Sequence, residues 1–174
     1  YHEGIPGHHL QIAISQELGD LPMIRKHAHV TAYAEGWGLY TERLADEMGL
    51  YSTPLDRIGM LSADSMRAGR LVVDTGIHSL GWSRQQAIDY FLDNSPMSRV
   101  TVEGEVDRYI GYPGQALAYM IGRLEIMRLR SEAKQAMGDR FDIKGFHDVV
   151  LNSGPVPLPV LAERVGAWQP AGPA

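Results

Sequence analysis

The chain has 174 residues, of which 44% are hydrophobic and 21% charged, so it is long enough and apolar enough for one ordinary globular domain. Its formal net charge of −5 argues against a nucleic-acid-binding protein, and no stretch approaches the roughly 20 apolar residues of a membrane-spanning helix. Because there is no cysteine, disulfides and thiolate zinc sites are excluded, and any metal must be held by histidine and carboxylate.

The residue pattern predicts helices nearly throughout, with no convincing strand. Apolar residues at helical spacing predict a first helix over residues 8–18, followed by a connection over 19–26. A long helix is expected over 29–48, where Gly36 and Gly38 each weaken helix propensity by about 1 kcal/mol relative to alanine. We therefore expect a neighbouring group to approach the backbone closely at these two glycines.

Further helices are predicted in the rest of the chain, with Ser83 and Asp142 as N-caps. They are expected over residues 54–77, 84–92, from 101 to the break at 111–114, from that break to 138, over 143–151, and from 157 through 168. The fold class is therefore predicted to be all-α. We predict one domain over residues 1–168 and a flexible tail rich in proline, glycine and alanine over 169–174.

The opening segment, Tyr-His-Glu-Gly-Ile-Pro-Gly-His-His, gathers four groups that can bind a metal: His2, Glu3, His8 and His9. Neutral imidazole is the commonest metal ligand, and a carboxylate beside a ligating histidine is the usual general base of zinc hydrolysis. The cluster looks like a stretched form of the zinc-peptidase motif H-E-x-x-H.

The spacing of these histidines does not suit a straight helix. His8 follows His2 by six residues, which turn a helix by about 600° and leave His8 on the wrong face. The seven residues to His9 restore the face but add roughly 10.5 Å of rise, too long for metal bonds of about 2.0–2.1 Å. Pro6 and Gly7 therefore predict a bulge or break, which could bring His2 and His8 together.

A third ligand is needed, and Glu35 is the candidate. It stands between small residues on an otherwise apolar stretch, where a carboxylate is costly unless it is paired or bound to a metal. The alternative is a buried glutamate paired with arginine or histidine. Glu42, two turns later, is a second candidate ligand or an outer partner of a ligating histidine.

Four stretches carry a resemblance to a known family: HEGIPGHHLQ at 2–11, AEGWGLYTE at 34–42, VDTGIHSLGW at 73–82 and RYIGYPGQALAYMIGRLEI at 108–126. In this order they resemble a bacterial family named domain of unknown function 885, from residue 2 to about 168. That family is grouped with gluzincin-type zinc peptidases, which include thimet oligopeptidase, carboxypeptidase Taq and angiotensin-converting enzyme.

The resemblance implies a zinc-dependent peptide hydrolase. Matched to the motif of those peptidases, His2, His8 and Glu35 become the zinc ligands and Glu3 the general base. His9 remains an alternative to His8 as the second ligand.

The resemblance also implies groups on later helices that act on a peptide substrate. Gluzincin-type peptidases use tyrosine or histidine to stabilise the carbonyl oxygen, and His78 and Tyr112 are the candidates, with Tyr109 and Tyr119 behind them. The arginines Arg67 and Arg70 could hold a substrate carboxylate.

Two rival hypotheses stay open: a degenerate module that binds metal without turnover, and a structural helical module whose polar cluster is an ion-pair network. The chain starts within a motif, so we expect it to be the C-terminal part of a longer protein, and by itself it could lack activity. The compartment is not predicted. His27, His29 and His147 are expected to be loop or surface residues.

Overall fold

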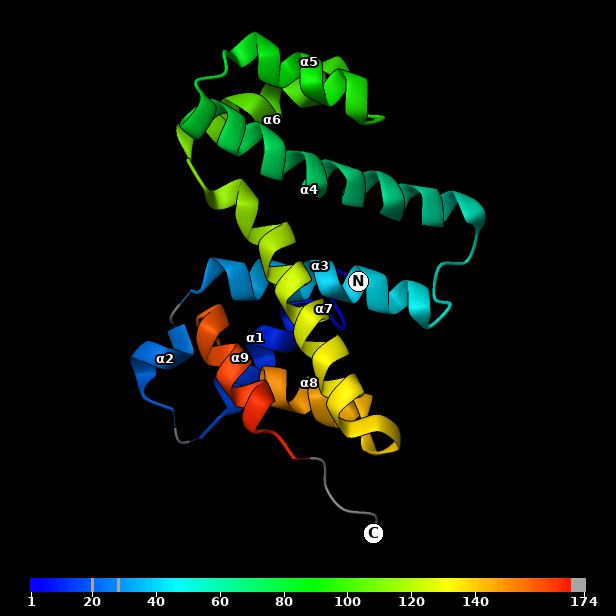
Figure 1. Cartoon of the computed structure of the whole chain (residues 1–174), viewed down its shortest axis with the longest axis vertical. Coiled ribbons are helices and arrows are strands. Elements are labelled where there is room, and N and C mark those ends of the chain that lie inside the picture. Colours follow the sequence, from blue (N-terminus) through cyan, green and yellow to red (C-terminus); the bar gives the residue numbers. More distant parts are fainter. Residues whose placement is uncertain (20, 28, 170–174) are drawn as a thin grey trace. The chain divides into compact units, whose positions relative to one another are not determined.

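The computed structural model describes residues 1–19, 21–27 and 29–169, and all regular secondary structure in these ranges is helical, as the sequence predicts (Figure 1). Within the same ranges, none of the helices combines the length and apolarity needed to cross a membrane. Of the predicted tail, residues 170–174 lie outside the described residues. Internal contacts divide the chain into unit 1, Tyr1–Glu42 with Ile121–Ala174, and unit 2, Arg43–Met120. The single domain over 1–168 stays a prediction, and we describe each unit by itself.

Unit 1 holds the helices from both ends of the chain. They are α1 (His8–Glu17), α2 (Met23–His27), most of α3 (Thr31–Glu47) and of α7 (Ala118–Met137), the 3-10 turn η2 (Gly138–Arg140), α8 (Ile143–Leu151) and α9 (Leu158–Ala167). The prediction of a connection over 19–26 was wrong, because α2 lies largely within it. A helix of five residues is little longer than one turn, so it shows no apolar periodicity in the sequence.

Helices α3 and α7 touch through their backbones. A Cβ added to Gly36 would lie 2.5 Å from the Cα of Gly122, and one added to Gly122 would lie 1.9 Å from the carbonyl oxygen of Ala32. The expected close approach at Gly36 is therefore confirmed. The approach fixes α3, which carries Glu35 and Glu42, against the core of unit 1.

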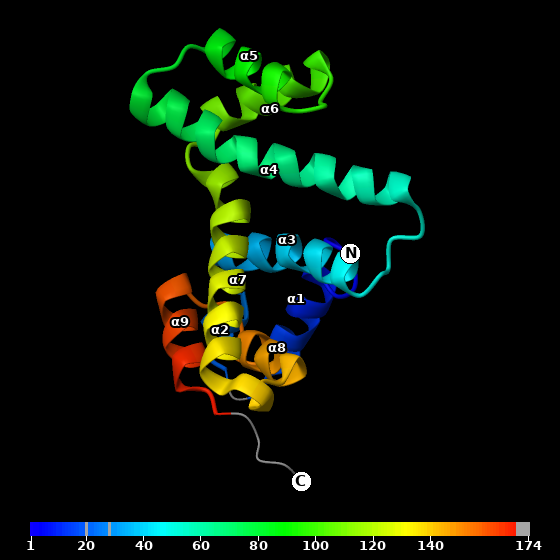
Figure 2. The same cartoon turned by 45° about the vertical axis from the view of Figure 1, so that its right-hand side comes forward.

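Unit 2 is built on α4 (Pro54–Leu80), against which α5 (Arg84–Asn94) and α6 (Arg99–Gly111) pack side by side (Figure 2). The 3-10 turn η1 (Gln115–Leu117) follows, and α7 begins after it. Ser83 caps α5 as predicted: its Oγ accepts from the backbone N–H of Gln86, whose side chain accepts from the N–H of Ser83. Helix α6 begins two residues earlier than expected, because Ser98 caps it. The buried core of this unit consists of Val73, Ala87, Ile88, Phe91, Val102, Val106, Tyr109 and Ala116.

Candidate metal site

The segment between His2 and His8 is a tight loop, and α1 begins at His8 itself. The backbone N–H groups of His8 and His9 donate to the carbonyl oxygens of His2 and Glu3, at 2.8 and 3.0 Å. A Cβ on Gly7 would lie 1.8 Å from the carbonyl oxygen of His2, so this closure requires glycine there. The break expected at Pro6 and Gly7 is thus present, and it replaces the helical turn that H-E-x-x-H would form.

A hydrogen bond from a side chain of α3 also fixes this loop. The indole Nε1 of Trp37, a side chain only 1% exposed, donates to the carbonyl oxygen of Pro6 at 2.9 Å. This bond ties the tip of the loop to the helix that carries Glu35.

His2, His8 and Glu35 converge. The Oε2 of Glu35 lies 3.2 Å from Nε2 of His8 and 3.5 Å from Nε2 of His2. All three side chains are mostly buried, with exposed fractions of 18% for His8, 11% for His2 and 15% for Glu35. Two ligands of a tetrahedral zinc ion stand about 3.3–3.4 Å apart, given bonds of about 2.0–2.1 Å. The residues therefore fit a zinc ion, although the same distances also fit hydrogen bonds in an ion-pair network.

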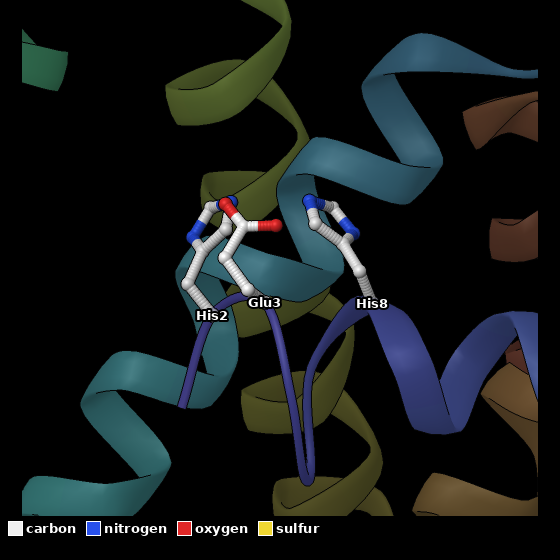
Figure 3. A group of neighbouring side chains, drawn as sticks. All are labelled: His2, Glu3 and His8. Atoms are coloured by element: carbon white, nitrogen blue, oxygen red, sulfur yellow. The ribbon is translucent and has the colours of Figure 1, made fainter.

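Glu3 completes the cluster on its open side. Ligand atoms of Glu3, His2 and His8 lie within 4.8 Å of one another, and Figure 3 shows the Glu3 carboxylate between the two imidazole rings. Unlike the histidines, Glu3 is exposed. An exposed carboxylate at this position can exchange protons with water, which is what a general base requires.

Glu42 bonds the far side of the His2 ring. Its Oε1 lies 2.8 Å from Nδ1 of His2, and because a carboxylate can only accept, His2 carries the proton on Nδ1. That tautomer leaves the lone pair of Nε2 directed toward Glu35 and His8. The geometry is that of an outer carboxylate that orients a ligating histidine, the second of the two roles considered for Glu42.

Gly38 makes room for both imidazoles. A Cβ there would lie 2.8 Å from Nε2 of His2 and 3.0 Å from Cε1 of His8. The close approach expected at Gly38 is thus made by the histidine rings. His9, the alternative second ligand, is exposed and is not in the cluster.

The predicted donors His78, Tyr109 and Tyr112 all belong to unit 2. Nε2 of His78 lies 2.9 Å from the carbonyl oxygen of Tyr109, and the hydroxyl of Tyr109 donates to Glu105 at 2.5 Å. The ring of Tyr109 is 1% exposed, so its geometry favours a structural role. Tyr112, which follows the end of α6, is 61% exposed.

The predicted substrate-binding group Arg67, Arg70 and Tyr119 also belongs to unit 2. Arg70 is 5% exposed; its Nε donates to the Tyr109 hydroxyl at 2.9 Å and its Nη2 to Glu105 at 2.9 Å. Its guanidinium lies 4.7 Å from the centre of the Tyr119 ring. This geometry favours a structural role for Arg70, while Arg67 is half-buried on α4. Recognition of a substrate carboxylate by Arg67 and Arg70 stays a prediction.

Sequence reasoning missed the network around Glu105. Burial raises the pKa of this carboxyl, but hydrogen bonds from Tyr109, Arg70 and Arg108 outweigh burial and lower the pKa to about 2. Burial likewise raises the pKa of Tyr109, so its hydroxyl stays protonated. The sequence could have indicated the bond between Glu105 and Tyr109, because residues four apart on a helix lie next to each other.

The prediction for His147 was wrong, because this half-buried residue of α8 packs against the buried aromatic side chains of Trp37 and Tyr40 on α3. Its Nε2 lies 2.7 Å from the hydroxyl of Tyr40, and its ring packs edge-on against Trp37. His27 and His29 are exposed, as expected.

Comparison with known proteins places the chain in a family. The sequence matches the family described as bacterial protein of unknown function, DUF885, over residues 1–165. No protein with a curated description matches it.

Two solved structures are similar over nearly the whole chain. A candidate lipoprotein from Colwellia psychrerythraea shares 47% sequence identity with a TM-score of 0.94, over 97% of this chain and 29% of its own. A candidate lipoprotein of unknown function from Shewanella oneidensis shares 31% identity with a TM-score of 0.85, over 93% of this chain and 30% of its own. The present chain therefore spans less than a third of either protein. Because the family match extends over residues 1–165 of 174, the chain belongs to the bacterial family DUF885.

Proposed function

We propose that the chain carries the metal site of a zinc-dependent peptide hydrolase. The observation that carries this proposal is the convergence of His2 and His8 on one oxygen of Glu35, at 3.5 and 3.2 Å. Two histidines and a glutamate, with a fourth position left for water, are a ligand set typical of catalytic zinc. The resemblance of the sequence motifs to gluzincin-type peptidases supports the same function.

The zinc ion and the side chains would have different parts in the reaction. When bound, zinc would lower the pKa of water toward about 7 and polarise the substrate carbonyl. Glu3 accepts a proton from water as the water oxygen attacks the carbonyl carbon of the peptide. When the carbon–nitrogen bond breaks, Glu3 returns that proton to the leaving amine and is regenerated as a carboxylate.

A donor from the later helices to the carbonyl oxygen, on which negative charge develops during attack, remains what the resemblance implies, and Tyr112 is the most exposed of its tyrosine candidates. A hydrogen bond that strengthens in the transition state lowers the barrier, and the donor must be accessible to substrate. The side chain of Tyr112 is 61% exposed, whereas Tyr109 and His78 are engaged within unit 2.

The test combines metal content with hydrolysis of a quenched peptide library. We expect one zinc ion per chain by mass spectrometry, lost in His8→Gln and in Glu35→Gln but kept in the control His9→Gln, which removes an exposed imidazole. Glu3→Gln should keep the zinc and lose hydrolysis, and retained turnover would remove Glu3 from the role of base.

The two rival hypotheses, a degenerate metal-binding module and a structural helical module, predict different results in the same assay. Zinc binding without hydrolysis by the wild-type chain would favour a degenerate metal-binding module. No zinc binding, together with loss of stability in His8→Gln, would favour a structural ion-pair network.

A further inference from the structure

Trp37 of α3, whose indole N–H holds the loop between His2 and His8, is itself enclosed by two rings of unit 1. The centroid of the Tyr40 ring lies 5.4 Å from that of the indole, and the imidazole of His147 on α8 lies 5.6 Å from it, edge-on at 85°. Tyr40 is three residues from Trp37 on the same helix, where side chains are neighbours. Trp37 is 1% exposed and Tyr40 is 0% exposed, so close packing restricts the rotation of both rings.

Hydrogen bonds fix the two enclosing rings. The hydroxyl oxygen of Tyr40 lies 2.7 Å from Nε2 of His147, and it accepts from Nη1 of Arg130, on α7, at 3.3 Å. Because a guanidinium can only donate, the hydroxyl can give its own proton to the lone pair of the His147 ring. Side chains from α3, α7 and α8 therefore meet at one hydroxyl group beside the indole.

The indole connects this group of side chains with the loop. Its Nε1 donates to the carbonyl oxygen of Pro6 at 2.9 Å, and Pro6 lies two residues before His8, at which α1 begins. The direction of the indole N–H therefore helps to set where the loop ends and His8 begins. Because distances between a metal and its ligands tolerate only about 0.2 Å, a rotation of the indole would disturb the metal site.

We infer that Tyr40 and His147 are positioning residues of the candidate metal site, which fix the Trp37 indole and through it the loop between His2 and His8. The inference rests on the proposed function, in which these two histidines bind zinc. Neither positioning residue needs to contact the ion, because each acts through the indole.

The zinc affinity of the whole chain, measured against a chromophoric chelator, tests the inference with a matched control. Tyr40→Phe keeps the ring and removes the hydroxyl, and should weaken zinc binding by about threefold, less than the loss of a direct partner of a ligand causes. The control Tyr33→Phe removes another buried hydroxyl of α3, which donates to the carbonyl oxygen of Val150, and should leave zinc affinity unchanged. Each variant loses one buried hydrogen bond, so both should melt about 2–4 °C lower, and only a positioning role separates them by affinity.

A double variant tests whether Tyr40 acts through the indole. Trp37→Phe removes the N–H donor and should weaken zinc binding by about tenfold. Tyr40→Phe added to it should cause no further loss, whereas a full additional loss of about threefold would overturn the positioning role. If Tyr40→Phe does not fold, His147→Phe takes its place, because it keeps a ring against the indole at a half-buried position and removes the acceptor.

Hydrogen exchange at the indole N–H, measured by NMR on the metal-free chain, separates this inference from the proposed function. The chain has three tryptophans, so each indole gives its own signal. Exchange at Trp37 should be faster by about threefold in Tyr40→Phe and unchanged in Tyr33→Phe. Unchanged exchange in Tyr40→Phe would overturn the inference. If the wild-type chain binds no zinc, the proposed function fails, while the exchange still decides whether Tyr40 and His147 hold the indole.

Discussion

Gly38 lies on α3 beside both imidazoles of the candidate metal site. A Cβ added there would lie 2.8 Å from Nε2 of His2, whereas ordinary contact begins at 3.4 Å, so that nitrogen would have to move by 3.4 − 2.8 = 0.6 Å. Metal–ligand distances tolerate only about 0.2 Å. We therefore predict that Gly38→Ala lowers zinc affinity by about 10–100-fold, equivalent to roughly 1.4–2.7 kcal/mol.

The fold should tolerate the same change. The atoms in the way are the ends of two side chains that can rotate, and alanine is more favourable than glycine in a helix interior by about 1 kcal/mol. We expect the metal-free variant to melt within about 2–4 °C of the wild type, the shift that about 1 kcal/mol causes in a chain of this length. Zinc titration against a chromophoric chelator and thermal melting by circular dichroism would measure the two effects separately.

Two further glycines serve as controls for this prediction. Gly59 on α4 has nothing within 4 Å of an added Cβ, so Gly59→Ala should leave zinc affinity unchanged. Gly36→Ala would bring a Cβ to 2.5 Å from backbone atoms of Gly122, which cannot rotate away, and should lower stability by about 1–3 kcal/mol. Unchanged zinc affinity in Gly38→Ala would refute the assignment of His2 and His8 as ligands.

Two other predictions concern the carboxylates Glu42 and Glu105. Glu42→Gln should weaken zinc binding by about 10-fold while the fold survives, because a neutral amide oxygen holds the N–H of the His2 ring more weakly than a carboxylate does; equal affinity in the same titration would contradict that role. The pKa of Glu105 is lowered from 4.5 to about 2, so its hydrogen bonds to Tyr109 and Arg70 stabilise the fold above pH 4.5 and are lost as the pH falls toward 2. After allowance for partial exposure, Glu105→Gln should cost about 1–2 kcal/mol in urea denaturation at pH 7, and the difference from wild type should shrink at pH 3; a constant difference would argue against the network.

Most helices could be predicted from the sequence because their signals are local. Ser83 and Asp142 cap helices as expected, and the Gly111–Gly114 break separates α6 from η1. The boundary at Ser98 was misjudged because Thr101, three residues on, is equally acceptable as a cap in sequence. Helix α2 was not predicted, because a helix of five residues is too short to show apolar residues at helical spacing.

The candidate site could be predicted only in part. Pro6 and Gly7 indicated the break, and the placing of Glu35 among small residues indicated a partner. The bond from Trp37 to Pro6 and the space left by Gly38 depend on how the loop docks on α3, which no local pattern encodes. The same holds for His147, since its partner Tyr40 is 107 residues away in the chain.

The two extra residues of the opening motif change what holds the site together. In H-E-x-x-H the ligands and the base share one helix, whose backbone sets their spacing. Here His2 and Glu3 precede α1, and His8 is its first residue, so the helix itself cannot set the spacing. Two sets of hydrogen bonds set the spacing instead. The backbone N–H groups of His8 and His9 donate to the carbonyl oxygens of His2 and Glu3, and the Trp37 indole of α3 donates to the carbonyl oxygen of Pro6. The geometry of the candidate ligands therefore depends on α3, which also supplies Glu35, Gly38 and Glu42. We expect substitutions on α3 to weaken zinc binding more than substitutions on the exposed face of α1 do.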